Sequence, residues 1–188
     1  MTDDATDLTG KLLIAMPGMG DPRFEKSVIL MCAHGEDGGM GLIINKPAPE
    51  IDLNDLLEQL SIEAPEPIAA RVFFGGPVEN SRGFVLHSVE YRQDDTTLDV
   101  GGRFGMTATL DILRAMAEGL GPDRSIVALG YAGWGPGQLE SEIVENGWLV
   151  ADADPDLVFG SDNSGKWIAA ISALGIDPIM LSGAGGRA

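Results

Sequence analysis

Cys32 and His34 are the two residues of this chain whose types and spacing most directly suggest chemistry. They lie two positions apart in the apolar segment 27–34, which reads as a buried strand, and alternate side chains of a strand point to one face. An imidazole beside a thiol lowers the thiol pKa and creates a nucleophile or a redox centre. The competing interpretation is a buried structural cysteine, because a reactive thiol needs an electropositive setting and Glu36 and Asp37 follow here. We expect the second outcome, a largely buried thiol that reacts slowly.

The remaining motifs for metal, nucleotide or hydrolytic chemistry are incomplete. Aspartates alternate over 152–156 as in a calcium loop, but Pro155 interrupts them and Asp154 suits a helix cap better. Segment 160–166 matches a phosphate-binding loop up to Trp167, where magnesium binding needs Ser or Thr. The chain has no G-x-S-x-G and no H-E-x-x-H motif, and one cysteine cannot build a zinc cage. We therefore predict no metal and no cofactor.

Segment 130–138 (GYAGWGPGQ) is the most unusual stretch of the sequence. It reads as a glycine-rich turn between a strand and a helix, where positive φ or close backbone approach is required. We interpret it first as a structural turn, with Trp134 mostly buried and Gln138 lining a shallow groove beside it. Binding is the alternative role, and the candidate binding surface then comprises Gly75, Gly76, Pro77, Arg82, His87, Trp134 and Gln138.

The elements that must position these residues follow from hydrophobic periodicity and from glycine and proline. Strands are predicted at 12–16, 27–34, 40–45, 71–74, 83–87, 97–100, 102–106, 125–130, 148–151 and 178–181. Helices are predicted at 53–60, 107–118, 137–146 and 166–174. The strands come early and in hairpins and the helices later, so the predicted class is α+β. Residues 1–7 read as a flexible acidic tail, and 8–188 as a single domain.

Composition limits the partners of this chain. Its 188 residues carry 12 Lys and Arg against 29 Asp and Glu, a net charge of −17. The cations are scattered, whereas nucleic-acid binders cluster them, so direct DNA binding is not expected. An anionic membrane surface repels the chain for the same reason. With no apolar run long enough to cross a bilayer and no secretory signal, we expect a cytoplasmic protein.

Many segments together resemble the YqgE/AlgH family of bacterial proteins, from about Leu8 onward. The matching motifs are Leu13 to Pro17, Asp21-Pro22, Ser27-Val28-Ile29, Met40 to Pro47, Gly75 to Val78, Arg82 to His87, Gly130 to Trp134, Gly137 to Glu140, Trp148-Leu149 and Leu174 to Asp177. The resemblance implies a bent, branching and mostly antiparallel sheet flanked by helices, in a cytoplasmic protein without an established biochemical activity. The family often carries the label of transcriptional regulator, although no DNA-binding motif is apparent.

Two departures from the family pattern weaken a shared catalytic role. The family usually reads Cys-Glu-His-Asn where this chain has Cys32-Ala33-His34-Gly35, so the acid between Cys and His is missing. The family's terminal Ala-Gly-His-Ala is replaced here by Ala184 to Ala188 without a histidine.

Three functional hypotheses follow. The leading one is a non-enzymatic regulatory or binding protein that acts through an unknown protein or small-molecule partner. The second is a thiol-dependent enzyme or redox sensor that uses Cys32 and His34. The third is direct regulation at DNA, which is the family label taken literally.

Overall fold

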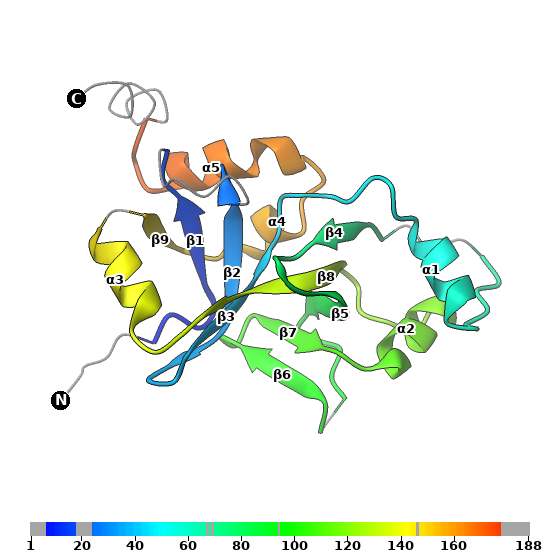
Figure 1. Cartoon of the computed structure of the whole chain (residues 1–188). Helices are drawn as coiled ribbons and strands as arrows, with labels where there is room; N and C mark the ends of the chain where they lie inside the picture. Colours follow the sequence, from blue (N-terminus) through cyan, green and yellow to red (C-terminus); the bar gives the residue numbers. More distant parts are fainter. Residues whose placement is uncertain are drawn as a thin grey trace.

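The apolar runs of the sequence form the strands of one curled sheet (Figure 1). The computed structural model describes residues 7–17, 24–66, 68, 70–93, 95–145 and 147–177. Within them nine strands join in the order β6-β7-β5-β8-β3-β2-β1-β9, with β4 paired to β8 off this path. The strands are β1 (Lys11–Ala15), β2 (Val28–Gly35), β3 (Gly38–Ile43), β4 (Val72–Phe74), β5 (Val78–Ser88), β6 (Thr97–Val100), β7 (Phe104–Thr107), β8 (Ser125–Trp134) and β9 (Trp148–Asp152). All pairings are antiparallel except that of β4 with β8.

The helices pack on both faces of this sheet. They are α1 (Leu53–Gln59), α2 (Leu110–Ala117), α3 (Gln138–Val144), α4 (Pro155–Val158), the 3-10 turn η2 (Asn163–Gly165) and α5 (Lys166–Ala173). Figure 1 shows α1 and α2 together at one end of the sheet and α3 at the other. The α+β class and the single domain predicted from the sequence are confirmed.

Alternation along the strands divides the apolar side chains between different cores. In β1, Leu12 and Ile14 face the inner core with α5, whereas Leu13 and Ala15 face the outer core beneath α3. A third core packs α1 and α2 against the outer side of β4, β5 and β8. Each fully buried aliphatic side chain contributes about 1.5–3 kcal/mol, so this alternation is the main source of stability.

Strand β8 is the point at which the sheet branches. One edge of β8 pairs with β5, while the other pairs first with β4 and then, over its last three residues, with β3. Gly75 lies in the fork, where its N–H donates to the Leu129 carbonyl and its carbonyl accepts from the Ile43 N–H. The branching architecture implied by the family resemblance is thus present.

Glycine is required where the two branches separate. Gly130 adopts φ +78°, which lets β8 bend as it changes partners. A side chain on Gly75 would collide with the Gly130 carbonyl, and one on Gly76 would collide with the Tyr131 backbone. The glycines of the predicted 75–77 turn therefore hold the fork together.

Several predicted elements differ from those observed. The strand predicted at 83–87 spans Val78–Ser88 as β5, and the helix predicted at 107–118 begins only at Leu110 because Thr107 ends β7. Segment 130–134 is the second half of β8, not a turn, because β8 continues past Gly130 by pairing with β3. The hairpin of β2 and β3 has the expected position, but its turn contains only Glu36 and Asp37. The strand predicted at 178–181 and most of the 1–7 tail lie outside the described residues.

Candidate functional site

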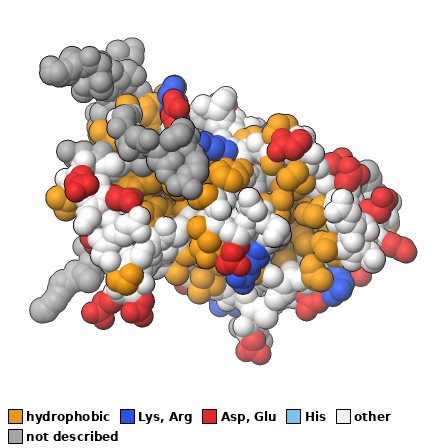
Figure 2. Space-filling model, in the orientation of Figure 1, with side chains coloured by type: hydrophobic (Ala, Val, Ile, Leu, Met, Phe, Trp, Pro, Cys, Tyr) orange, Lys and Arg blue, Asp and Glu red, His pale blue; other side chains and the backbone are white. Residues whose placement is uncertain are grey.

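An apolar groove opens where the inner face of the curled sheet reaches the surface between β3, β5, β7 and β8. It encloses about 600 Å³. We call it the Arg82 groove, and its lining residues are Gly39, Met40, Val78, Arg82, Phe84, Met106, Ala108, Tyr131, Gly133 and Trp134. On the face shown in Figure 2, hydrophobic side chains gather over the middle of the molecule, whereas acidic side chains lie mostly around its outline.

The floor of the Arg82 groove is an edge of the inner core that is partly exposed at Met40 and Tyr131. Phe84 and Met106 are buried members of that core, and Met40 and Tyr131 pack against it while partly exposed. The rings of Phe84 and Tyr131 meet edge to face with centroids 5.8 Å apart. Such aromatic and methionine surfaces are typical of ligand pockets, because methionine adapts its shape to the occupant.

Arg82 lies at the rim of this floor with its hydrogen-bonding groups unused. Its guanidinium carbon lies 5.1 Å from the centroid of the Phe84 ring, a cation–π position. The nearest carboxylate oxygen, on Glu79, is 3.9 Å away, which is too long for a hydrogen bond. The hydroxyl of Tyr131 donates to Oε2 of Glu79 at 3.3 Å, the same oxygen that faces Arg82. Among the described residues, nothing accepts a hydrogen bond from Arg82.

Trp134 borders the groove as the last residue of β8, while its side chain packs in the outer core with Trp148 and Leu139. Its side chain is 7% exposed, which confirms the predicted burial. Its indole N–H donates to Oε1 of Glu142 at 2.9 Å. Gln138 donates to Oε2 of the same carboxylate and accepts from the Gly135 N–H, so it braces the turn into α3 and is absent from the groove lining.

His87 lies inside the protein, away from the groove surface. Its ring is fully buried, with Nδ1 2.9 Å from the Ser88 carbonyl oxygen and Nε2 2.8 Å from Oγ1 of Thr107. The carbonyl can only accept, so Nδ1 carries the proton and Nε2 accepts from Thr107. Thr107 in turn contacts Thr97 at 2.8 Å. Burial lowers the pKa of His87, which favours this neutral ring. Because His87 is buried, it does not share a binding surface with Arg82, contrary to the prediction from the sequence.

Cys32 and His34 point to opposite sides of β2, which corrects the predicted pairing. The strand register shifts between Met31 and Ala33, so Cys32 is the extra residue of a β-bulge and the alternation of faces changes after it. Cys32 is buried in the inner core, and desolvation raises its pKa to about 12. His34 instead reaches α3 over the outer core, with Nε2 2.9 Å from Glu140, while Nδ1 accepts from the Leu8 N–H.

Sequence reasoning missed Lys166, which is a buried cation. Its ammonium group donates to the carbonyls of Ile44 at 2.8 Å and Val158 at 2.7 Å and lies 5.5 Å from the Phe73 ring centroid. Desolvation lowers its pKa to about 8. The lysine of the incomplete phosphate-loop motif therefore fastens α5 to β3 and α4. The available signal was a lysine at the start of the helix sequence KWIAAISA, which is apolar apart from Lys166 and Ser172.

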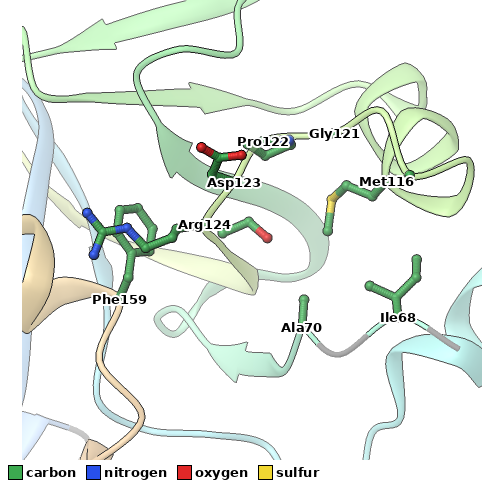
Figure 3. A pocket seen from close by; sticks show the side chains of 10 residues that line it. Ile68, Ala70, Met116, Gly121, Pro122, Asp123, Arg124 and Phe159 are labelled. Atoms are coloured by element: carbon green, nitrogen blue, oxygen red, sulfur yellow. The ribbon is translucent and has the colours of Figure 1, made fainter.

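A second hollow of about 390 Å³ lies between the α2–β8 connection and the segment before β4 (Figure 3). The cation that lines this hollow, Arg124, already has partners: it donates a hydrogen bond to Asp156 at 2.8 Å and lies over the Phe159 ring. Figure 3 shows Arg124 beside Phe159, with Met116 and Ile68 at the opposite end. This hollow, which the sequence did not suggest, lacks the unpaired donor that distinguishes the Arg82 groove.

Two further observations bear on the kind of site present. Within the part of the chain that the structure describes, no three His, Cys, Asp or Glu side chains come together to hold a metal ion. No helix there is long and apolar enough to span a membrane.

Comparison with known proteins places the chain among bacterial relatives. The family model described as AlgH-like matches residues 12–179. A UPF0301 protein of Ruegeria pomeroyi is 62% identical over 184 residues, which cover 97% of this chain and 100% of the relative. A UPF0301 protein of Paracoccus denitrificans is 56% identical over 189 residues, covering 99% and 100%.

Solved structures agree with this placement. The solution structure of the AlgH protein from Pseudomonas aeruginosa is similar with a TM-score of 0.78 and 39% identity, over 100% of this chain and 98% of that one. A crystal structure of a Corynebacterium diphtheriae protein shares the fold, with a TM-score of 0.70, 23% identity and coverage of 92% and 90%. The matched family model, the identity to the relatives and the shared branching sheet together show that this chain belongs to the AlgH-like family.

Proposed function

We propose that this protein is a non-enzymatic binding protein that exerts a regulatory effect through a partner held in the Arg82 groove. The observation that carries the proposal is the combination of an exposed apolar floor with an arginine whose hydrogen-bonding groups are unused. Surfaces of this composition gain free energy by losing contact with water, and a free guanidinium adds directional recognition.

The positions of the candidate catalytic groups support binding over catalysis. The Cys32 thiol is buried with a pKa of about 12, and the His34 ring lies toward α3 on the opposite side of the strand. His87 is neutral and enclosed in its hydrogen-bond network. None of these three side chains lines the groove, so none of them faces a bound partner there.

In our proposal the protein acts in the cytoplasm and regulates indirectly, through its partner and not by binding DNA. One arginine is the only cation among the groove residues, whereas DNA binding rests on several phosphate contacts made together. The net charge of −17 opposes DNA further. The lone buried cysteine and the bacterial relatives support a reducing bacterial cytoplasm.

The test uses phenylnaphthylamine, a neutral dye that fluoresces in apolar sites, so that binding does not depend on charge. We expect saturable one-site binding to the native chain and loss of binding in Ala108→Trp, because exposed Ala108 lines the groove and a large ring there fills it. Ala169→Trp is the matched control, an exposed alanine on α5 away from the groove. Equal dye binding by both variants would contradict the proposal.

A further inference from the structure

We propose that the occupant of the Arg82 groove is a small carboxylate with a flat apolar body, such as an aromatic acid. This inference rests on the binding function proposed above and adds the chemical class of the ligand. Two features carry it independently: the shape and apolar character of the floor, and the open donors at one end.

The floor selects a flat apolar body. Tyr131 is the partly exposed ring of the Phe84–Tyr131 pair, so a ligand ring can stack on it, while buried Phe84 supports it edge to face at an interplanar angle of 83°. Met40 and Met106 border these rings with flexible thioethers that contact aromatic faces well. Gly39 and Gly133 leave the walls without side chains, which gives a flat body close access to the backbone.

The rim selects a carboxylate. An arginine has five N–H donors in a planar fork that matches the two oxygens of a carboxylate. Arg92, Arg103, Arg114 and Arg124 each make at least one hydrogen bond to a carboxylate or carbonyl oxygen, whereas Arg71, outside the groove lining, and Arg82 make none among the described residues. The Arg82 guanidinium carbon lies 5.1 Å from the centroid of the Phe84 ring, and one of its nitrogens lies 3.9 Å from Glu79. Its donors are therefore open beside the apolar floor, where they can bind an anionic partner.

The size and charge of the site favour a small molecule with a single acid group. A volume of about 600 Å³ lies within the usual range of small-ligand pockets. Glu79 lies 3.9 Å from Arg82, so a second anionic group on the ligand would meet a carboxylate at the same rim. The net charge of −17 repels extended polyanions more strongly than a single carboxylate.

The experiment compares naphthoate with naphthalenemethanol, which share the aromatic body and differ in the acid. Dissociation constants are measured by titration of the full chain, with amide chemical shifts locating the site. We expect both to shift groove residues and naphthoate to bind about tenfold more tightly, since a hydrogen bond to a charged group contributes more than a neutral one.

Two substitutions assign the preference to Arg82. Arg82→Gln should remove the tenfold preference while leaving the affinity for naphthalenemethanol within about twofold. Arg114→Gln is the matched control, because the two arginine side chains are 56% and 55% exposed and each lies three residues from an acid. Arg114 lies on α2 outside the groove lining, so its variant should keep the full preference.

The outcomes separate this inference from the proposed function. If naphthalenemethanol and naphthoate bind the groove equally, or if Arg82→Gln retains the preference, the carboxylate assignment is wrong although binding stands. If neither compound nor the neutral dye binds, the binding function itself is wrong.

Discussion

The indole of Trp134 meets that of Trp148 edge to face, with ring centroids 6.0 Å apart, and both rings donate their N–H to one carboxylate oxygen of Glu142. The distances to that oxygen are 2.9 and 2.8 Å. Strand β8, strand β9 and helix α3 are thus joined through one acid. The junction therefore anchors, from the outer core, the end of β8 whose residues Tyr131 and Gly133 line the Arg82 groove.

Trp134→Ala should lower the free energy of unfolding by about 3–5 kcal/mol, the usual cost of removing a large buried aromatic side chain. Trp134→Phe keeps a ring and should cost less. Urea denaturation measures both, with Val144→Ala on the exposed side of α3 as a control expected to match the parent. A Trp134→Ala variant as stable as the parent would show that the indole is not part of the core.

Glu142→Ala should destabilise the protein more than Glu142→Gln. Removal of the carboxylate leaves two partly buried indole N–H groups without acceptors, at about 1–3 kcal/mol each, whereas the glutamine oxygen still accepts. Thermal unfolding of the two variants checks the order, and equal melting temperatures would contradict it.

The Cys32 thiol should react slowly with an aromatic disulfide reagent in the native protein and quickly in urea. It is buried with a pKa of about 12, so very little thiolate exists at neutral pH. The control is Ala33→Cys in a Cys32→Ala background, because Ala33 is exposed on the same strand. That variant should react at least tenfold faster, and fast labelling of native Cys32 would restore the thiol hypothesis.

Stability should fall as the pH drops below about 6.5, the ordinary pKa of histidine in an unfolded chain. Burial lowers the pKa of His87 in the folded state, so the unfolded state takes up the proton first. The stabilising contribution is therefore complete above this pH and decreases as the pH falls toward the folded pKa. The free energy of unfolding measured between pH 7 and pH 5 should change less in His87→Gln than in the parent. Parallel curves would contradict the assignment.

The ionisation of Lys166 should change the free energy of unfolding at alkaline pH. Desolvation lowers its pKa from 10.5 to about 8, so between these values the folded state releases its proton before the unfolded state does. The parent should gain stability relative to Lys166→Met as the pH rises through this window, because neutral Lys166 still donates to Ile44 and Val158. Comparing the two proteins cancels the titration of other groups, and a constant difference would contradict the prediction.

Much of this fold is determined by local sequence. The alternation of Leu12 and Leu13 between cores, the Asp154 cap ahead of Pro155 and the burial of Cys32 and Trp134 were all predictable. The reason is that hydrophobic periodicity and capping chemistry depend on neighbours within one strand or one helical turn. The family motifs extend this to the branching sheet, because they recur together along nearly the whole chain.

Tertiary structure alone decided which of the chemically interesting residues meet. The β-bulge at Cys32 puts the side chains of Cys32 and His34 on opposite faces of β2. Segment 130–134, which the sequence predicts as a turn, is a strand because β8 continues past Gly130. Both depend on pairing with β3, a distant segment whose register no local pattern reports. The free guanidinium of Arg82 is likewise a consequence of where Phe84 and Glu79 lie in the folded chain. Residue types were sufficient to single out Arg82, Trp134 and His87, but only long-range packing decided that Arg82 lines the groove, that the Trp134 indole packs in the outer core and that His87 is buried.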